Sequence, residues 1–372
     1  MSHRIFGRLT KTLVVAGVVA LAVSGCSSGG GASGSNGGSA GSGKSGSDLK
    51  IALSNSYNGN SWRQQMVSDF TKAATSAKKA GQISDFTIVN SNNDATQQIS
   101  QLKAMILQGY NAIVIDAASP TALNGVIKQA CDAKITVVVF DSLATAPCAY
   151  KLESNYLTYG QIETDFVAKQ LGGKGNLLEI RGVAGTSVDI DISKGIHTAV
   201  DKNPGLKIVG SVNGNWTTTV AQQAVVGILP SLPKVDAVVG QGGDGAGAVA
   251  AFQAQHLPVP LVIMGNRGDD LRVWKQILTT DPSYQTTSIS SMPGMSSIAF
   301  WVAYLAASGD KVPKTVYAPL LQIPKDHLDA WLAVTAADGV ASKVFTLKET
   351  KGFVKSAVDK APKYVVSDLP SK

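Results

Sequence analysis

Short apolar runs rich in β-branched residues recur along the chain and alternate with longer segments of helical periodicity. The short runs lie at residues 50–53, 86–89, 112–115, 135–140, 176–180, 207–212, 236–239, 261–264 and 287–290. Helical periodicity is clearest at residues 62–79, 95–108, 121–131 and 159–171. This alternation predicts an α/β fold, in which parallel strands are covered by helices on both faces. About nine strands favour two open sheets over one.

The N-terminal residues have the pattern of an export signal. Arg4, Arg8 and Lys11 precede an uninterrupted run of Leu, Val, Ala and Gly at residues 13–23, which is too short to span a bilayer. Small residues then lead directly to Cys26, in the manner of the lipobox of bacterial lipoproteins. We therefore predict a signal peptide over residues 1–25 and lipid attachment at Cys26. An ordinary signal peptide with an incidental cysteine is the alternative.

Residues 27–47 consist almost entirely of Gly and Ser, which make up 17 of the 21 positions. Such a segment cannot bury enough apolar surface to offset the entropy lost on ordering, so it predicts a flexible tether over residues 26–47. A lipid anchor followed by a tether predicts a folded domain on the outer face of a bacterial cell membrane. A linker without an anchor would have the same composition, and only Cys26 distinguishes the two.

Composition and charge exclude several other classes of protein. The chain has 372 residues, of which 44% are hydrophobic and 16% are charged, as in globular proteins. The net charge of +7 includes three cations of the predicted signal peptide, and the rest form no basic arm, so no nucleic-acid partner is expected. The three Cys and four His are scattered, so we expect no metal site.

Cys131 and Cys148 remain after export and flank the predicted strand at residues 135–140. Two such thiols usually pair in an oxidising compartment, so we predict a disulfide between them. The alternative is a pair of buried, unlinked cysteines.

Polar side chains and tryptophans follow nearly every predicted strand. In open α/β sheets, ligands bind beyond the carboxyl ends of the strands, so these residues are candidate ligand contacts. Carboxylates and amides can bind adjacent hydroxyl groups, and indole faces pack on the C–H face of a sugar ring. The set therefore favours a polyhydroxylated ligand. It lies at residues 56–63, 116, 141–142, 181–182, 213–216, 241–244, 266–267 and 291.

With these residues in view, the chain resembles the sugar-type periplasmic substrate-binding proteins of ABC importers, close to ribose-binding proteins, over residues 49–318. The resemblance rests on the segments at residues 51–53, 60–63, 97–109, 112–116, 120–123, 137–141, 185–187, 246–248 and 291–294. It implies a type I periplasmic binding fold, in which two doubly wound lobes are joined by a hinge of three strands.

The resemblance also implies a division of the chain and of the site. Residues 48–154 and 292–318 would form the N-terminal lobe, and residues 155–291 and 319–372 the C-terminal lobe, with the hinge near Ser154, Ser291 and Ala318. The first-lobe contacts would be Asn60, Trp62, Arg63, Asp116 and Asp141. The second-lobe contacts would be Trp216, Gln241 and Asn266, with Ser291 at the return crossing.

Three departures from the family pattern point away from ribose itself. The family's usual Arg after the Gly185-Thr186-Ser187 segment is missing from residues 188–193. The usual Asn-Asp pair is replaced by Gln241 to Asp244, with a register uncertain by one, and Asn266 stands where Asp is common.

The predicted function is non-enzymatic: a monomeric lipoprotein captures a sugar or polyol, without a cofactor, and delivers it to an importer permease. A chemosensory receptor of the same fold is one alternative. A carbohydrate hydrolase is another, because Asp116 and Asp141 end neighbouring strands and two carboxylates are what a glycosidase needs. Residues 240–245 match a dinucleotide-binding G-x-G-x-x-G motif. However, the motif lies late in the chain, and its glycines are better explained by close backbone packing.

Overall fold

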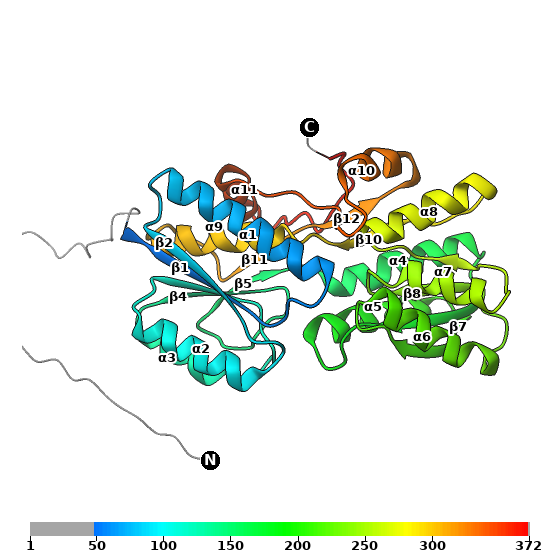
Figure 1. Ribbon diagram of the computed structural model, residues 1–372, viewed down its shortest axis with the longest axis horizontal. Coiled ribbons are helices and arrows are strands. Elements are labelled where there is room, and N and C mark those ends of the chain that lie inside the picture. The colour runs from blue at the N-terminus through cyan, green and yellow to red at the C-terminus, as the bar shows by residue number, and fades with distance from the viewer. Residues whose placement is uncertain (1–47, 371–372) are drawn as a thin grey trace, which may run out of the picture. The chain divides into compact units, whose positions relative to one another are not determined.

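The computed structural model describes residues 48–370 and shows an α/β protein built around two parallel sheets (Figure 1). The predicted signal peptide, the predicted lipidation site Cys26 and the predicted tether lie outside the described residues. Within the described range, no helix has both the length and the apolar character needed to cross a membrane.

The first lobe contains a six-stranded sheet in the order β11-β5-β4-β3-β1-β2, with every pair parallel. The strands are β1 (Lys50–Asn55), β2 (Asp85–Asn90), β3 (Ala112–Ile115), β4 (Thr136–Phe140), β5 (Tyr150–Glu153) and β11 (Thr315–Tyr317). Helices α1 (Ser61–Lys79) and α9 (Met295–Ala307) cover one face, and α2 (Ala95–Leu107) and α3 (Asn124–Asp132) cover the other (Figure 1). The central strands β1, β3 and β4 are apolar on both faces because helices cover both.

The second lobe contains a four-stranded parallel sheet in the order β7-β6-β8-β9. Its strands are β6 (Lys174–Arg181), β7 (Gly205–Asn213), β8 (Ala237–Gly240) and β9 (Leu261–Val262). Helices α4 (Tyr156–Gln170) and α5 (Ser187–Lys202) pack on one face, and α6 (Thr218–Ile228), α7 (Gly245–Ala254) and α8 (Gly268–Thr280) on the other. Helices α4 and α5 approach closely because Gly160 and Gly195 face each other, with no room for a Cβ at either position.

Three connections carry the chain between the elements of the two lobes. They run from β5 to α4, from β10 (Ser288–Ser291) to α9, and from β11 to β12 (Leu320–Ile323), at the positions of Ser154, Ser291 and Ala318. Strand β12 pairs antiparallel with β10 and parallel with β13 (Val365–Val366). The predicted fold class, with two parallel-sheet lobes and three joining strands, is confirmed.

The C-terminal segment corrects one part of the predicted domain division. Residues 319–372 were expected to belong to the C-terminal lobe alone. Helix α10 (Leu328–Val334) does pack against α8, but α11 (Leu347–Val358) packs against α9 and β11 of the first lobe. The Phe345 N–H donates to Ser297 Oγ, and the Trp301 indole N–H donates to the Phe345 carbonyl. Apolar and hydrogen-bonding contacts to α9 therefore decide where this helix lies.

The predicted disulfide between Cys131 and Cys148 is present, with the two Cα atoms 6.4 Å apart. It links the last turn of α3 to the segment that follows β4, beside the loop that carries Asp141. Two short 3-10 helices, η2 (Leu229–Ser231) and η3 (Lys325–His327), complete the described elements.

Candidate functional site

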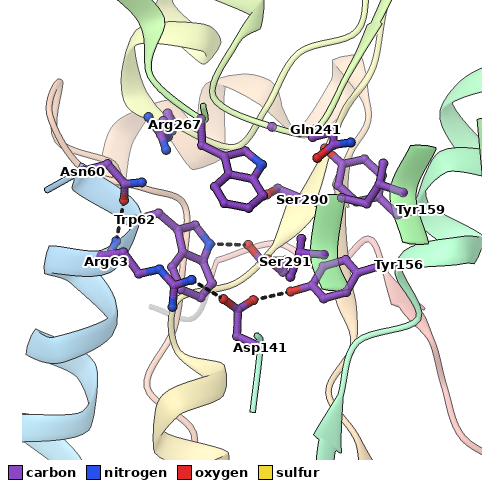
Figure 2. Close-up of a pocket in the computed structure, with 14 residues that line it drawn as sticks. Asn60, Trp62, Arg63, Asp141, Tyr156, Tyr159, Gln241, Arg267, Ser290 and Ser291 are labelled. Carbon is purple, nitrogen blue, oxygen red and sulfur yellow. Dashed lines mark hydrogen bonds and ion pairs between the residues drawn. The ribbon is translucent and has the colours of Figure 1, made fainter. Parts of the chain in front are cut away.

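A cavity is lined by residues of both lobes (Figure 2). Seven of the nine predicted ligand residues line it, namely Asn60, Trp62, Arg63, Asp141, Trp216, Gln241 and Ser291. The other lining residues are Tyr156, Tyr159, Val188, Ile192, Gly242, Arg267 and Ser290. A mostly apolar hollow with a few convergent polar groups is typical of small-molecule sites.

Arg63 is the centre of a charged network on the first lobe. The Asn60 side chain caps α1 by accepting from the Arg63 backbone N–H at 2.9 Å, which fixes Arg63 in the first turn of the helix. The Arg63 guanidinium forms ion pairs with Asp116 and, at 2.9 Å, with Asp141, and donates to Ser142 Oγ at 3.4 Å. Asp116, another predicted contact, is fully buried behind Arg63 and lies outside the lining of the cavity.

Asp141 follows the buried strand β4 in the left-handed backbone region, with a φ of 54°. Figure 2 shows its carboxylate between Arg63 and the Tyr156 hydroxyl, which donates to Oδ1. Burial, with a contribution from Asp141, raises the pKa of Tyr156 well above its ordinary value, so the phenol keeps its proton. The Asp141 carboxylate is therefore held in a fixed direction from two sides.

The two predicted tryptophans line the cavity from different lobes. The Trp62 indole N–H donates to the Ser291 carbonyl at 3.0 Å, and the Arg63 guanidinium lies 5.1 Å from the Trp62 ring centroid. The Trp216 ring lies so close to Gly182 that a Cβ there would overlap it. These contacts fix both indoles beside the cavity.

Gln241 lines the cavity, but its side-chain amide already has protein partners. Its Oε1 accepts from the Gly182 N–H at 2.9 Å, and its Nε2 donates to Asp189 O and Oδ1 at 3.0 and 3.1 Å. Asp189 also receives two hydrogen bonds from Arg181, at 3.0 and 2.7 Å. Gln241 thus joins the ends of strands β6 and β8 to the first turn of α5.

Asn266, also a predicted contact, lies outside the lining of the cavity. Its Nδ2 donates to the Leu321 carbonyl at 2.9 Å, its Oδ1 accepts from the Ser288 hydroxyl, and only 1% of its surface is exposed. The following residue, Arg267, lines the cavity instead.

Gly242 and Gly243 explain the glycine motif that resembled a dinucleotide fingerprint. Both have left-handed backbones, with φ of 84° and 87°. A Cβ on Gly242 would lie 2.9 Å from Ser290 Oγ and 3.0 Å from the Tyr159 hydroxyl, and a Cβ on Gly243 would overlap the Arg267 guanidinium. The glycines therefore allow three polar side chains to approach the backbone of this loop.

Comparisons with known proteins agree with this architecture. The family model of the periplasmic binding protein domain matches residues 51–311 of this chain. A xylitol-binding protein of Mycolicibacterium smegmatis is 28% identical over 64% of this chain and 68% of its own length. A ribose import binding protein of Bacillus subtilis is 25% identical over 66% and 78%.

Among solved structures, an ABC transporter solute binding protein from Thermobispora bispora is 36% identical. The match has a TM-score of 0.80 and covers 87% of this chain and all of that protein. The predicted resemblance to periplasmic substrate-binding proteins is thereby confirmed. The matching domain and these relatives are described as binding proteins rather than as enzymes.

Proposed function

Because the chain belongs to the periplasmic binding protein family, we propose that it captures a sugar or polyol outside the cytoplasm and delivers it to an ABC-type importer. The observation that carries this proposal is the cavity between the lobes, to which each lobe contributes an indole and a guanidinium. Xylitol and ribose, for which two relatives are named, are small polyhydroxylated molecules of this class.

The chemistry of the lining residues suits such a ligand. The Asp141 carboxylate has lone pairs left to accept hydroxyl protons, and the side-chain N–H groups of Asn60 and Arg63 can donate to hydroxyl oxygens. The indoles of Trp62 and Trp216 offer flat apolar surfaces for the C–H face of a ring or chain. We assign these residues, together with Ser291 at the crossing, as ligand contacts.

Ligand capture would work by closure of the lobes. A ligand that contacts both lobes binds the closed arrangement better than the open one, and only this difference can drive closure. The hinge would lie at Ser154, Ser291 and Ala318, where the chain passes between the lobes.

The mature protein would act as a monomer, attached through a lipid on Cys26 and held by the tether of residues 26–47. The permease of the importer would be its protein partner. A labelled fatty acid should be incorporated into the parent protein and not into a Cys26→Ala variant, and equal labelling of the two would contradict the anchor.

A thermal-shift screen of purified residues 48–372 tests the binding role. The panel comprises pentoses, hexoses, polyols, inositols and their acid derivatives. A ligand at a hundred times its Kd stabilises the folded state by about 2.7 kcal/mol, which gives a clear shift. Small-angle scattering at saturation should show a smaller radius of gyration. If no member of the panel stabilises the protein, the proposal fails.

A further inference from the structure

Arg267 is a buried cation that lacks a protein partner. Only 7% of the residue is exposed, and its side chain lines the cavity (Figure 2). Within residues 48–370, its guanidinium makes neither a hydrogen bond nor an ion pair, whereas Arg63 pairs with two carboxylates and Arg181 with one. A buried charge without a partner is unfavourable, so this position favours a ligand that supplies one.

The acidic residues around Arg267 do not serve as that partner. Asp270 uses its two oxygens to accept from the backbone N–H groups of Ala246 and Gly265, at 2.6 and 2.9 Å. Burial raises the pKa of Asp270 to about 7 and the pKa of Asp244 well above its ordinary value, against the lowering effect of Arg267. Neither carboxyl group forms an ion pair or a hydrogen bond with the Arg267 guanidinium within residues 48–370.

Two more hydrogen-bond donors lie beside Arg267, separated from it only by the Gly242-Gly243 turn. The hydroxyls of Tyr159 and Ser290 both line the cavity, and neither donates to another residue of the described chain. Burial raises the pKa of Tyr159 well above its ordinary value, so its hydroxyl remains a donor. We call Arg267, Tyr159 and Ser290 the donor cluster.

The donor cluster contrasts with the acceptor that the first lobe supplies. An arginine has five N–H donors and no acceptor, whereas a hydroxyl group of a neutral sugar brings a proton of its own that needs an acceptor when buried. On this side of the cavity, Gln241 Oε1 already accepts from the Gly182 N–H, and its Nε2 donates to Asp189. A carboxylate brings only acceptors, and its shape matches the fork of a guanidinium.

We propose that the ligand is a sugar acid, of the aldonate or uronate class, whose carboxylate binds Arg267 and whose hydroxyls bind Asp141. This inference rests on the proposed function, which it narrows from sugars in general to those with a carboxylate. It also gives a role to Arg267, a buried cation that lines the cavity.

Matched pairs of ligands test the proposal by titration calorimetry. The pairs are D-xylonate with xylitol, D-gluconate with D-glucitol, and D-galacturonate with D-galactose. In at least one pair, the acid should bind at least tenfold more tightly than its neutral partner. Arg267→Gln should remove that preference. Lys275→Gln, which removes an exposed cation of the same helix, should keep it.

The outcomes separate this inference from the proposed function. If neutral members bind as tightly as the acids or more tightly, the carboxylate proposal is wrong while sugar binding stands. If no member of any pair binds, the carboxylate proposal fails, and the wider thermal-shift panel decides whether sugar binding stands. If Arg267→Gln does not fold, Arg267→Lys replaces it, because lysine keeps the positive charge but lacks the paired N–H groups of a guanidinium. A loss of preference for the acid in this variant would still support bidentate binding.

Discussion

The two arginines that line the cavity differ in what surrounds them. Arg63 of the first lobe is held by Asp116 and Asp141, and Asp141 is held in turn by Tyr156. Arg267 of the second lobe has no such partners among residues 48–370. The first-lobe side of the site is therefore built by the protein alone, whereas the second-lobe side is completed by the ligand. We infer that a ligand binds first to the preformed side and that closure follows.

The buried acids discussed so far also differ between the lobes in whether they pair with an arginine. In the first lobe, Asp116 and Asp141 share the charge of Arg63. In the second lobe, burial raises the pKa of Glu163, Asp244 and Asp270. In the first lobe one arginine thus pairs with both of these buried carboxylates, whereas burial disfavours the charged form of these three acids of the second lobe.

The same substitution should lower the stability of the protein much more at Arg63 than at Arg267. Arg63→Met leaves two buried carboxylates without their cation and should lower the free energy of unfolding by about 3–5 kcal/mol. Arg267→Met breaks no ion pair and should change it by less than about 1 kcal/mol, while weakening ligand binding. Urea unfolding of both variants without ligand measures the difference. Equal losses would contradict the contrast between the two sides of the site.

Removal of the disulfide should destabilise the protein without altering the cavity. Cys131 and Cys148 enclose a segment of 17 positions, for which the loop-entropy model gives about 3 kcal/mol. Neither residue lines the cavity, so the double Ser variant should bind ligand with unchanged affinity once it is folded. Unfolding and calorimetry together test this. A large loss of affinity would mean that the disulfide positions the neighbouring Asp141 loop.

Substitution of the two tryptophans should affect ligand affinity and stability to different extents. Trp216→Ala removes an indole that makes no hydrogen bond within the described chain, and should weaken binding by more than about 1 kcal/mol with little change in unfolding. Trp62→Ala should weaken binding and also lower stability, because its indole is buried and donates to the Ser291 carbonyl. Calorimetry on the Trp216 variant decides the first point. Affinity equal to that of the parent would place the ligand elsewhere.

The sequence predicts the fold well because each buried strand is a continuous apolar run. All nine predicted strands are present. Four strands were missed, β5, β11, β12 and β13, and none of them contains an apolar run of more than two residues. The lobe on which α11 packs could not be predicted either, since an amphipathic pattern does not identify the surface that covers it.

The site was predicted less completely for two physical reasons. The predicted strand end carries both Asn266 and Arg267, and the family resemblance implied Asn266 as the contact, whereas Arg267 lines the cavity. Tyr156 and Tyr159, three positions apart on a helix, have the spacing of ordinary core residues. They line the cavity because α4 begins directly after the connection from β5, at Ser154, where the chain passes between the lobes.

Glu163 allows a test of whether burial raises the pKa of acids in the second lobe. It is fully buried, and its Oε2 accepts from the Gly240 N–H at 3.3 Å while Oε1 has no partner within residues 48–370. Burial raises its pKa well above the value of 4.5 that it has in an unfolded chain. The stability that the protonated group contributes is therefore complete below about pH 4.5 and is lost as the pH rises toward the folded-state pKa.

Glu163→Gln should therefore become more favourable, relative to the parent, as the pH rises. The amide of the variant can still accept from Gly240, and it does not titrate. The difference in unfolding free energy between variant and parent should therefore grow by at least about 1 kcal/mol from pH 5 to pH 8. Each unit by which the pKa is raised corresponds to about 1.4 kcal/mol. Urea unfolding at the two pH values measures it. Asp310→Asn, which removes an exposed acid, should show no such change. A difference that stays constant with pH would mean that Glu163 is ionised in the folded protein, and the contrast between the buried acids of the two lobes would fail.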